Sequence, residues 1–224
     1  MDGWVVRMAN GYSSRANSAS AIVSGAAMSP GLLHAVETLF RNAGLAPCVR
    51  VTPVAKRGTR EMLLARGYRI KDRTMVMTAP LGAHNCTSDH VRIEDTPTPG
   101  WLTGVSALQE PSKSNAAHLE AIVGRIQLPV AFATVVEAGE PIGFGMAAID
   151  RGFAELGSII LAPATRGRGL GRTLVQSLLG WAKETGAQQA FLQVTQENTA
   201  ARGLYGSAGF ADICGYTTMV CDGA

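Results

Sequence analysis

The sequence predicts an α/β fold in which helices pack around a mixed sheet. Two observations support this class. In the C-terminal half, short apolar runs give way to a regular alternation of helix-like and strand-like segments, which is typical of such folds. The 224 residues are 46% hydrophobic, which is enough apolar material to bury a sizeable core. A disordered or fibrous chain is thereby excluded.

Apolar runs bounded by glycine, proline and other turn residues predict five strands in the C-terminal half. They span residues 130–136, 142–149, 154–161, 191–194 and 210–220, the last as one strand or a strand pair. Apolar stripes at helical spacing predict three helices. They cover residues 115–127, a segment from about residue 169 to Gly186, and residues 199–208. A further strand is predicted at residues 4–8.

An internal repeat relates the two halves of the chain. The run GLAPCVRVTP, which begins at Gly44, resembles the run GAQQAFLQVTQ, which begins at Gly186. The resemblance continues in residues 63–68 against 204–210, with one position of slip, and in residues 74–77 against 217–220. Helix, strand, helix and strand thus recur in the same order, which favours a duplicated unit over chance similarity.

The two copies differ at the positions that bear on function. No arginine–glycine loop precedes the helix that the first copy places at residues 32–43, and Leu63 stands at the position of Tyr205. The first copy is therefore expected to keep the scaffold without a ligand site. Residues 79–89, which are rich in small and polar side chains, are the predicted linker.

Two interpretations stay open for the polar segment at residues 11–18. Arg15 and Asn17 line part of a substrate site, or the segment is a turn that side-chain hydrogen bonds stabilise. The sequence does not decide between them. Trp101 and Trp181 are expected in the core rather than against a ligand.

Charge and cysteine content exclude several function classes. The net charge of +3 is mild and the basic residues form no long stripe, so nucleic acid is not an expected partner. The four cysteines lack CxxC spacing and paired histidines, so neither a metal site nor a disulfide framework is expected. The first residues lack the pattern of a signal peptide, and no apolar run is long enough to span a bilayer. A cytoplasmic protein without a membrane partner is therefore expected.

The most informative segment is RGRGLGR, which runs from Arg166 to Arg172 between a predicted strand and a predicted helix. A glycine-rich turn exposes backbone N–H groups, and a helix N-terminus adds partial positive charge, so the segment suits a phosphate group. A P-loop is excluded because arginine replaces its lysine, and the dinucleotide fingerprint fails because Arg172 also replaces its third glycine. The pattern that remains is RxxGxG, formed by Arg166, Gly169 and Gly171.

This pattern belongs to a longer one. The run LAPATRGRGLGRTL is followed by NxxAxxLY, from Asn198 to Tyr205, and then by a Gly-Phe pair. Together these motifs resemble the acetyl-coenzyme A signature of the GCN5-related N-acetyltransferases (GNAT), over roughly residues 91–220. The resemblance implies a GNAT fold with a mixed, mostly antiparallel central sheet flanked by helices. It also implies a catalytic domain at residues 90–224 that binds acetyl-CoA, and a degenerate, half-GNAT-like domain at residues 1–80.

The resemblance assigns binding roles to individual residues. The backbone of the strand before the loop would pair with the pantetheine arm, and the N–H groups of the loop would hold the pyrophosphate. Cofactor binding is thus expected at Ile159, Ile160, Leu161, Arg166, Gly167, Arg168, Gly169, Leu170, Gly171, Arg172, Asn198 and Tyr205. A bulge in the strand would separate it from the strand at residues 191–194 and open a slot for the thioester.

Two residues are expected to be catalytic. Tyr205 would protonate the departing thiolate, because a phenol is a stronger acid than water; the alternative is a packed core aromatic. Glu155 would accept the ammonium proton directly or through water; the alternative is a solvated carboxylate at an edge position. Glu137 and Asp150, at strand ends, are weaker candidates for the base. Asn198 would also cap a helix, and its two roles are compatible.

The sequence therefore predicts an N-acetyltransferase that moves the acetyl group of acetyl-CoA directly to a primary amine, without a metal. The acceptor stays open between a small-molecule amine and the amine of a peptide or protein. A monomer or homodimer is expected. The alternative function is a non-catalytic acyl-CoA-binding or regulatory module with the same fold.

Overall fold

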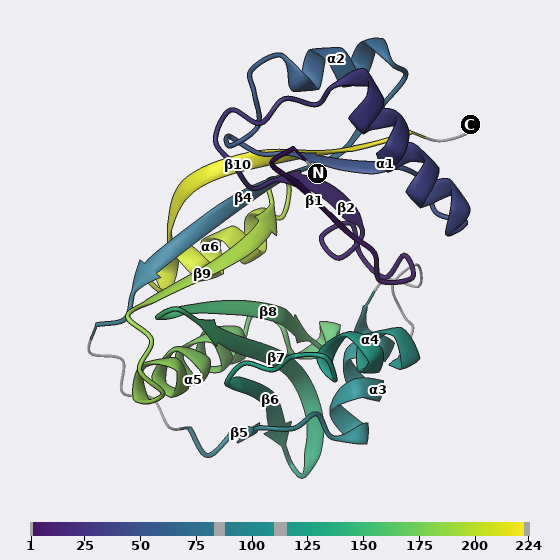
Figure 1. Cartoon of the computed structure of the whole chain (residues 1–224). Coiled ribbons are helices and arrows are strands. Elements are labelled where there is room, and N and C mark those ends of the chain that lie inside the picture. Colours follow the sequence, from purple (N-terminus) through teal and green to yellow (C-terminus); the bar gives the residue numbers. More distant parts are fainter. Residues whose placement is uncertain (1, 83–87, 110–115, 222–224) are drawn as a thin grey trace. The chain divides into compact units, whose positions relative to one another are not determined.

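The computed structural model describes residues 2–82, 88–109 and 116–221 (Figure 1). The chain forms two compact units. The first contains residues 1–75, 195–197 and 214–224, and the second contains residues 76–194 and 198–213. Strands β4 (Arg69–Pro80) and β10 (Ala211–Val220) each begin in one unit and end in the other. The last strand of each repeat therefore contributes residues to both units.

The first unit contains a small mixed sheet and two helices. Strands β1 (Trp4–Arg7), β2 (Ser18–Ala21) and β3 (Cys48–Val51) lie with β10 and β4 in the order β1-β2-β3-β10-β4. β1 pairs antiparallel with β2, β2 pairs parallel with β3, and β3 pairs antiparallel with β10. The helices are α1 (Pro30–Asn42) and α2 (Thr59–Ala65).

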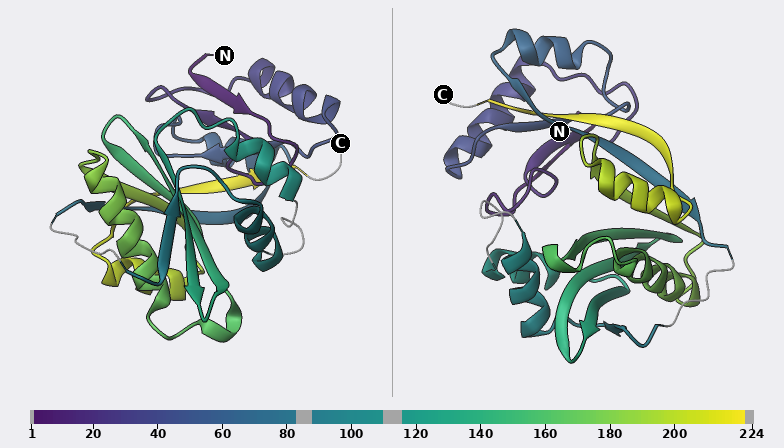
Figure 2. Two further views of the ribbon diagram at one scale, coloured as in Figure 1. Left: turned by 90° about the horizontal axis from the view of Figure 1, so that it is seen from below. Right: turned by 180° about the vertical axis from the view of Figure 1, so that it is seen from behind.

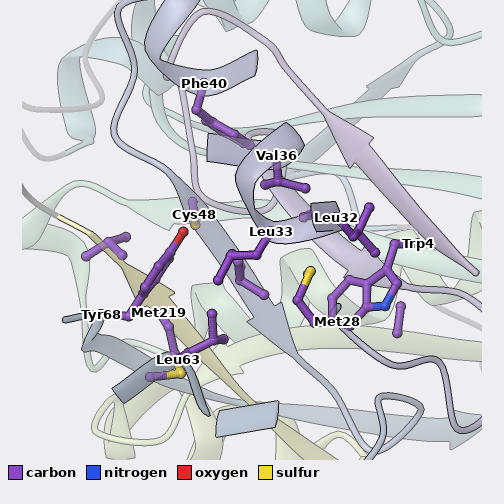
Figure 3. Close-up of a cluster of buried hydrophobic side chains, with 14 of the residues drawn as sticks. Trp4, Met28, Leu32, Leu33, Val36, Phe40, Cys48, Leu63, Tyr68 and Met219 are labelled. Atoms are coloured by element: carbon purple, nitrogen blue, oxygen red, sulfur yellow. The ribbon is translucent and has the colours of Figure 1, made fainter. Parts of the chain in front are cut away.

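Helix α1 supplies much of the core of this unit. Its N-terminus is capped by Ser29, whose hydroxyl accepts a hydrogen bond from the Leu32 N–H at 3.2 Å. Its apolar face, at helical spacing, packs in a buried cluster with α2 and β10 (Figure 3). The cluster includes Leu33, Val36, Phe40, Leu63 and Met219.

The second unit contains a larger mixed sheet with its strands in the order β4-β9-β8-β7-β6-β5. The strands that belong to it alone are β5 (Val91–Glu94), β6 (Val130–Glu137), β7 (Glu140–Asp150) and β8 (Phe153–Leu161), and all but the last residue of β9 (Gln189–Thr195) belongs to it as well. β5, β6, β7 and β8 pair antiparallel in sequence, and β8 pairs parallel with β9. The helices are α3 (Pro99–Leu108), α4 (Ala116–Val123), α5 (Leu170–Glu184) and α6 (Thr199–Ser207).

Helices α5 and α3 cover opposite faces of this sheet. α5 packs on β6, β7 and β8, and α3 packs on β7 and β8 (Figure 1, Figure 2). Successive residues of β7 mark the two faces, because Phe144 lies against Gly104 of α3 and Gly145 lies against Leu178 of α5. Trp101 of α3 is buried, and its indole N–H donates to one carbonyl of β6 and one of β7, both at 3.2 Å. The expected core position of Trp101 is confirmed.

The predicted fold class and most predicted elements are confirmed, but the sequence interpretation missed β5 and α3. The start of α3 carried a readable signal, because Thr98 is its N-cap and Pro99 lies in its first turn. The Thr98 hydroxyl accepts a hydrogen bond from the Trp101 N–H at 3.1 Å.

Two other predictions meet the limits of the described residues. The helix expected at residues 115–127 is α4, which ends at Val123; residues 110–115 lie outside the described part of the chain. Within the expected linker at residues 79–89, the first two residues belong to β4, and residues 83–87 lie outside the described part. In the described ranges, no helix is both long enough and apolar enough to cross a membrane.

The duplicated unit is confirmed at the level of its elements. The order α1-β3-α2-β4 recurs as α5-β9-α6-β10, and the antiparallel pairs β1–β2 and β7–β8 extend the match. The Tyr68 N–H donates to the Leu63 carbonyl, as the Phe210 N–H donates to the Tyr205 carbonyl, both at 3.0 Å. Leu63 therefore stands at the position of Tyr205, without the slip expected from the sequence. The domain boundaries at residues 1–80 and 90–224 stay predictions.

Asn17 stabilises the loop between β1 and β2. Its side-chain oxygen accepts hydrogen bonds from the N–H groups of Ala9 and Gly11, at 2.6 and 3.0 Å, and its amide donates to the Ser13 carbonyl at 2.9 Å. Asn17 is only 5% exposed, so it serves the turn rather than a surface that receives a ligand. Arg15 is exposed.

Candidate functional site

The predicted site residues all lie in the second unit, on β8, on the loop that follows it, at the start of α5, and on α6 or its N-cap. A short 3-10 helix (Pro163–Thr165) follows β8 and leads into the glycine-rich loop. Gly167 and Gly169 have φ angles of +76° and +82°, in the left-handed region that side chains other than glycine rarely adopt. Gly171 has a different reason to be glycine, because it is buried and a Cβ there would come within 3.2 Å of Leu204 Cδ2.

The loop presents a row of backbone donors. Within the described residues, the N–H groups of residues 167–171 make no hydrogen bond. The first helical bonds are donated by the N–H groups of Arg172 and Thr173, at 3.0 and 3.1 Å, both to the Gly169 carbonyl. Gly169 is the N-cap of α5 and makes no side-chain cap. Five adjacent donors at the positive end of a helix form a site that fits a diphosphate.

The strand before the loop is bulged, as expected. Ser158 and Ile159 of β8 lie together opposite Gly145 of β7, and Ser158 has a φ of +53°. The parallel pairing of β8 with β9 ends at Leu156 and Leu192. The continuation of β8, Ile159–Leu161, pairs only with β7 within the described residues. Its other edge is therefore available to pair with an extended ligand.

The arginine side chains of the loop make contacts of their own. Arg166 Nε donates to the Leu161 carbonyl at 3.3 Å. Arg168 makes a bidentate ion pair with Glu137 at the end of β6, at 2.9 and 2.5 Å. This hydrogen bond from Arg168 holds the pKa of Glu137 below its usual value, and the same pairing raises the pKa of Arg168. Glu137 is thus held as a carboxylate by its partner, which makes it a poor general base. Arg172 is exposed in the first turn of α5.

Asn198 and Tyr205 are placed by α6, which packs against α5. Asn198 caps the helix, because its side-chain oxygen accepts a hydrogen bond from the Ala201 N–H at 3.0 Å. Its exposed amide keeps two donors for a ligand. Tyr205 is 8% exposed and packs edge-to-face on Phe210, with ring centroids 6.0 Å apart. Tyr205 therefore has the structural role of a packed core aromatic. Its role as the acid that protonates the thiolate stays a prediction.

Glu155 lies on β8, three residues before the bulge, and is exposed. Its carboxylate accepts a hydrogen bond from the side chain of Gln193 on β9 at 2.8 Å. Sequence reasoning missed Gln193. The register of β8 with β9 pairs Glu155 with Phe191, so Gln193 is a diagonal neighbour on the same face of the sheet. Asp150, the other weaker candidate, lies beside Arg151 at 3.8 Å at the far end of β7.

The fold, the bulged strand and the donor-rich helix start together define an acetyltransferase of the GNAT type. The chain belongs to the family described as "Probable histone acetyltransferase Rv0428c C-terminal", which matches residues 1–216. In the described part of the chain, no group of His, Cys, Asp and Glu side chains is arranged to hold a metal ion.

The comparisons with individual proteins agree with this class. "Uncharacterized N-acetyltransferase YobR" of Bacillus subtilis (strain 168) is 28% identical over 216 residues, which cover 94% of this chain and 86% of YobR. The structure of a GCN5-related N-acetyltransferase from Kribbella flavida matches with a TM-score of 0.69 at 18% identity, over 93% of this chain and 82% of that one. A tandem GNAT protein from the clavulanic acid biosynthesis pathway matches with a TM-score of 0.65 at 16% identity, over 84% and 67% of the two chains. These two structures show the same fold.

Proposed function

We propose that the protein transfers the acetyl group of acetyl-CoA directly to a primary amine. One observation carries the proposal: five adjacent N–H donors, at residues 167–171, lie at an N-terminus that α5 does not cap. They follow a strand, β8, whose edge loses its partner at Leu156. A ligand that joins a diphosphate to an amide-containing arm fits both features, because the diphosphate suits the cluster of N–H donors and the arm suits the unpaired strand edge.

The residues of the chain divide the chemistry among them. Acetyl-CoA supplies an activated thioester. The N–H groups of residues 167–171 hold the pyrophosphate, and the edge of Ile159–Leu161 holds the pantetheine arm alongside the amide of Asn198. Tyr205 donates a proton to the departing sulfur, and Glu155 accepts the proton that the acceptor ammonium loses, directly or through water, so that the neutral amine attacks the thioester. The hydrogen bond from Gln193 orients the Glu155 carboxylate for that task.

The acceptor is a small-molecule amine or the amine of a peptide or protein. The family description names a histone acetyltransferase, so lysine-containing peptides belong in the first panel of acceptors. We also propose that the protein is cytoplasmic and acts as a monomer or homodimer. Its activity is proposed to need no metal, no membrane and no nucleic acid.

The proposal is tested by two measurements on the full chain. Isothermal titration with coenzyme A should show saturable binding, and release of free CoA from acetyl-CoA should become amine-dependent with at least one small or peptide amine. Tight CoA binding without release in the presence of any amine would instead indicate a non-catalytic acyl-CoA-binding module. The packed position of Tyr205 is the observation that supports this second function, because a structural role accounts for the ring without catalysis.

A further inference from the structure

Glu137 lies at the end of β6, where the β6–β7 hairpin sets its position closely. The turn has two residues, Ala138 and Gly139, with φ angles of +51° and +86°. Positive φ at both positions is what the tightest hairpin turns require. The strand that follows places Glu140 opposite Glu137, and the start of β7 also pairs with the end of β8. The hairpin therefore brings the Glu137 carboxylate beside the glycine-rich loop that follows β8.

The loop is fixed at its start by the backbone and at its centre by one side chain. The Ala162 N–H, directly after β8, donates to the Ile142 carbonyl of β7 at 2.8 Å. Farther along, Arg168 lies between two glycines in the left-handed conformation. Within the described residues, the backbone of residues 167 and 168 makes no hydrogen bond. The bidentate ion pair with Glu137 is therefore the contact that holds the centre of the loop.

The ion pair also decides which charges the loop presents. Both terminal nitrogens of the Arg168 guanidinium donate to the carboxylate of Glu137, so the positive charge is neutralised within the protein. Glu140 makes no salt bridge among the described residues, and two carboxylates directly opposite each other on a hairpin repel. Arg168 offsets this repulsion. Its side chain thus contacts the hairpin instead of projecting as a free cation.

We propose that Glu137 is a positioning residue of the coenzyme A site and acts through Arg168. The ion pair holds the donor row, which is formed by the N–H groups of residues 167–171, in the geometry that a diphosphate requires before the ligand arrives. Arg168 binds the diphosphate through its N–H, and its guanidinium anchors the loop. The inference rests on the proposed function, since it concerns the site that the donor row forms.

The other role open to Arg168 gives one substitution the opposite sign. If the guanidinium were a phosphate ligand for which Glu137 competes, Glu137→Gln would release it and tighten coenzyme A binding. If Glu137 positions the loop, Glu137→Gln weakens binding by about three- to fivefold, at the upper end for an exposed ion pair because this pair is bidentate. Arg168→Met removes the same anchor, so Glu137→Gln/Arg168→Met should be no weaker than Arg168→Met alone.

The test is isothermal titration of the full chain and these variants with coenzyme A. Glu140→Gln is the matched control, because it removes the neighbouring carboxylate of the same hairpin, leaves the ion pair intact and should bind as the wild type does. The ratio of the wild-type affinity to that of Glu137→Gln should fall toward one at about 1 M NaCl, because salt screens an exposed ion pair. With acetyl-CoA and an amine that is acetylated, Glu137→Gln should raise the KM for acetyl-CoA and leave kcat unchanged, a split that a general loss of stability does not produce.

The outcomes separate this inference from the proposed function. Unchanged or tighter coenzyme A binding in Glu137→Gln would overturn the inference and leave the proposed function standing. An equal loss in Glu140→Gln, or additive losses in Glu137→Gln/Arg168→Met, would also overturn it, because the effect would then not come from the ion pair. Absence of coenzyme A binding by the wild type would overturn the proposed function and this inference with it. Circular dichroism of each variant confirms the fold.

Discussion

The left-handed conformation of Gly169 offers a direct test of the donor row. Gly169→Ala places a Cβ at a φ of +82°, where no neighbouring atom lies within 4 Å. The substitution therefore changes backbone preference without creating a clash. An alanine that relaxes to a negative φ would turn the adjacent N–H groups away from a common point, and the loop would lose its shape as a diphosphate site.

The magnitude follows from the cost of that conformation. A residue with a Cβ is less stable in the left-handed region by about 1–2 kcal/mol. If binding requires the conformation, CoA affinity should fall by about 5- to 30-fold, since 1.4 kcal/mol is a factor of ten. If the free protein keeps the conformation as well, the same cost lowers the thermal midpoint by about 2–8 °C for a chain of this size.

The chain supplies a matched control. Gly186 follows α5 with a φ of +95° and also has open space around the Cβ position, so Gly186→Ala carries the same backbone cost outside the loop. Titration calorimetry with coenzyme A and thermal unfolding should separate the two variants. Both are expected to lose stability, but only Gly169→Ala is expected to lose CoA affinity. An equal loss of CoA affinity in Gly186→Ala, or unchanged affinity in Gly169→Ala together with an unchanged thermal midpoint, would refute the assignment of the donor row.

Three further predictions concern single side chains. Tyr205→Phe keeps the ring packed on Phe210 but removes the hydroxyl, so steady-state assays should show turnover reduced by about 100-fold or more at unchanged CoA affinity; wild-type turnover would remove the acid role. Glu155→Gln should lower turnover at unchanged CoA affinity, and wild-type turnover would assign the base to another group. Burial raises the pKa of the Cys48 thiol from 9.0 to about 11, so the folded state keeps a proton that the unfolded state releases. That stabilisation is complete below pH 9 and is lost as the pH rises toward 11. Urea unfolding should therefore show that the free energy of unfolding declines less over this range in Cys48→Ala than in the wild type; equal declines in the two proteins would contradict this assignment.

The sequence was informative where one segment contains its own signal. The glycines at 167 and 169, the cap at Asn198 and the alternation from α5 to β10 could be interpreted locally, because turn chemistry and periodicity act over a few residues. The bulge at Ser158 was expected only through the family resemblance, since a serine at a φ of +53° carries no local signal. α3 was missed although Thr98 and Pro99 mark its start.

The partners of the charged residues could not be predicted in this way. Arg168 meets Glu137 across 31 positions, and Glu155 meets Gln193 across 38. Both pairs depend on strand register and on where the β6–β7 turn ends, which no spacing within the sequence specifies. The conformation of the glycine-rich loop was thus predictable, whereas the electrostatic surroundings of the candidate base required the structure.

The two helix starts of the repeat give a physical reason to expect one cofactor per chain. α1 leaves fewer donors open than α5 does: Pro30 has no N–H, the Leu32 N–H donates to the Ser29 hydroxyl, and the Leu33 N–H donates to the Ser29 carbonyl. α5 begins at Gly169, which offers no side chain, so its donors are left for a ligand.

The strands before these helices also favour a ligand site in the second copy only. β2 has four residues and no described bulge, whereas β8 has nine residues and is bulged beside the loop. A helix N-terminus that caps itself cannot also bind a diphosphate, so the first copy should bind no coenzyme A. Titration calorimetry should therefore give a stoichiometry of one CoA per chain, which Gly169→Ala weakens as a single class of sites. A stoichiometry of two, with one class insensitive to Gly169→Ala, would show that a capped helix start does not prevent binding.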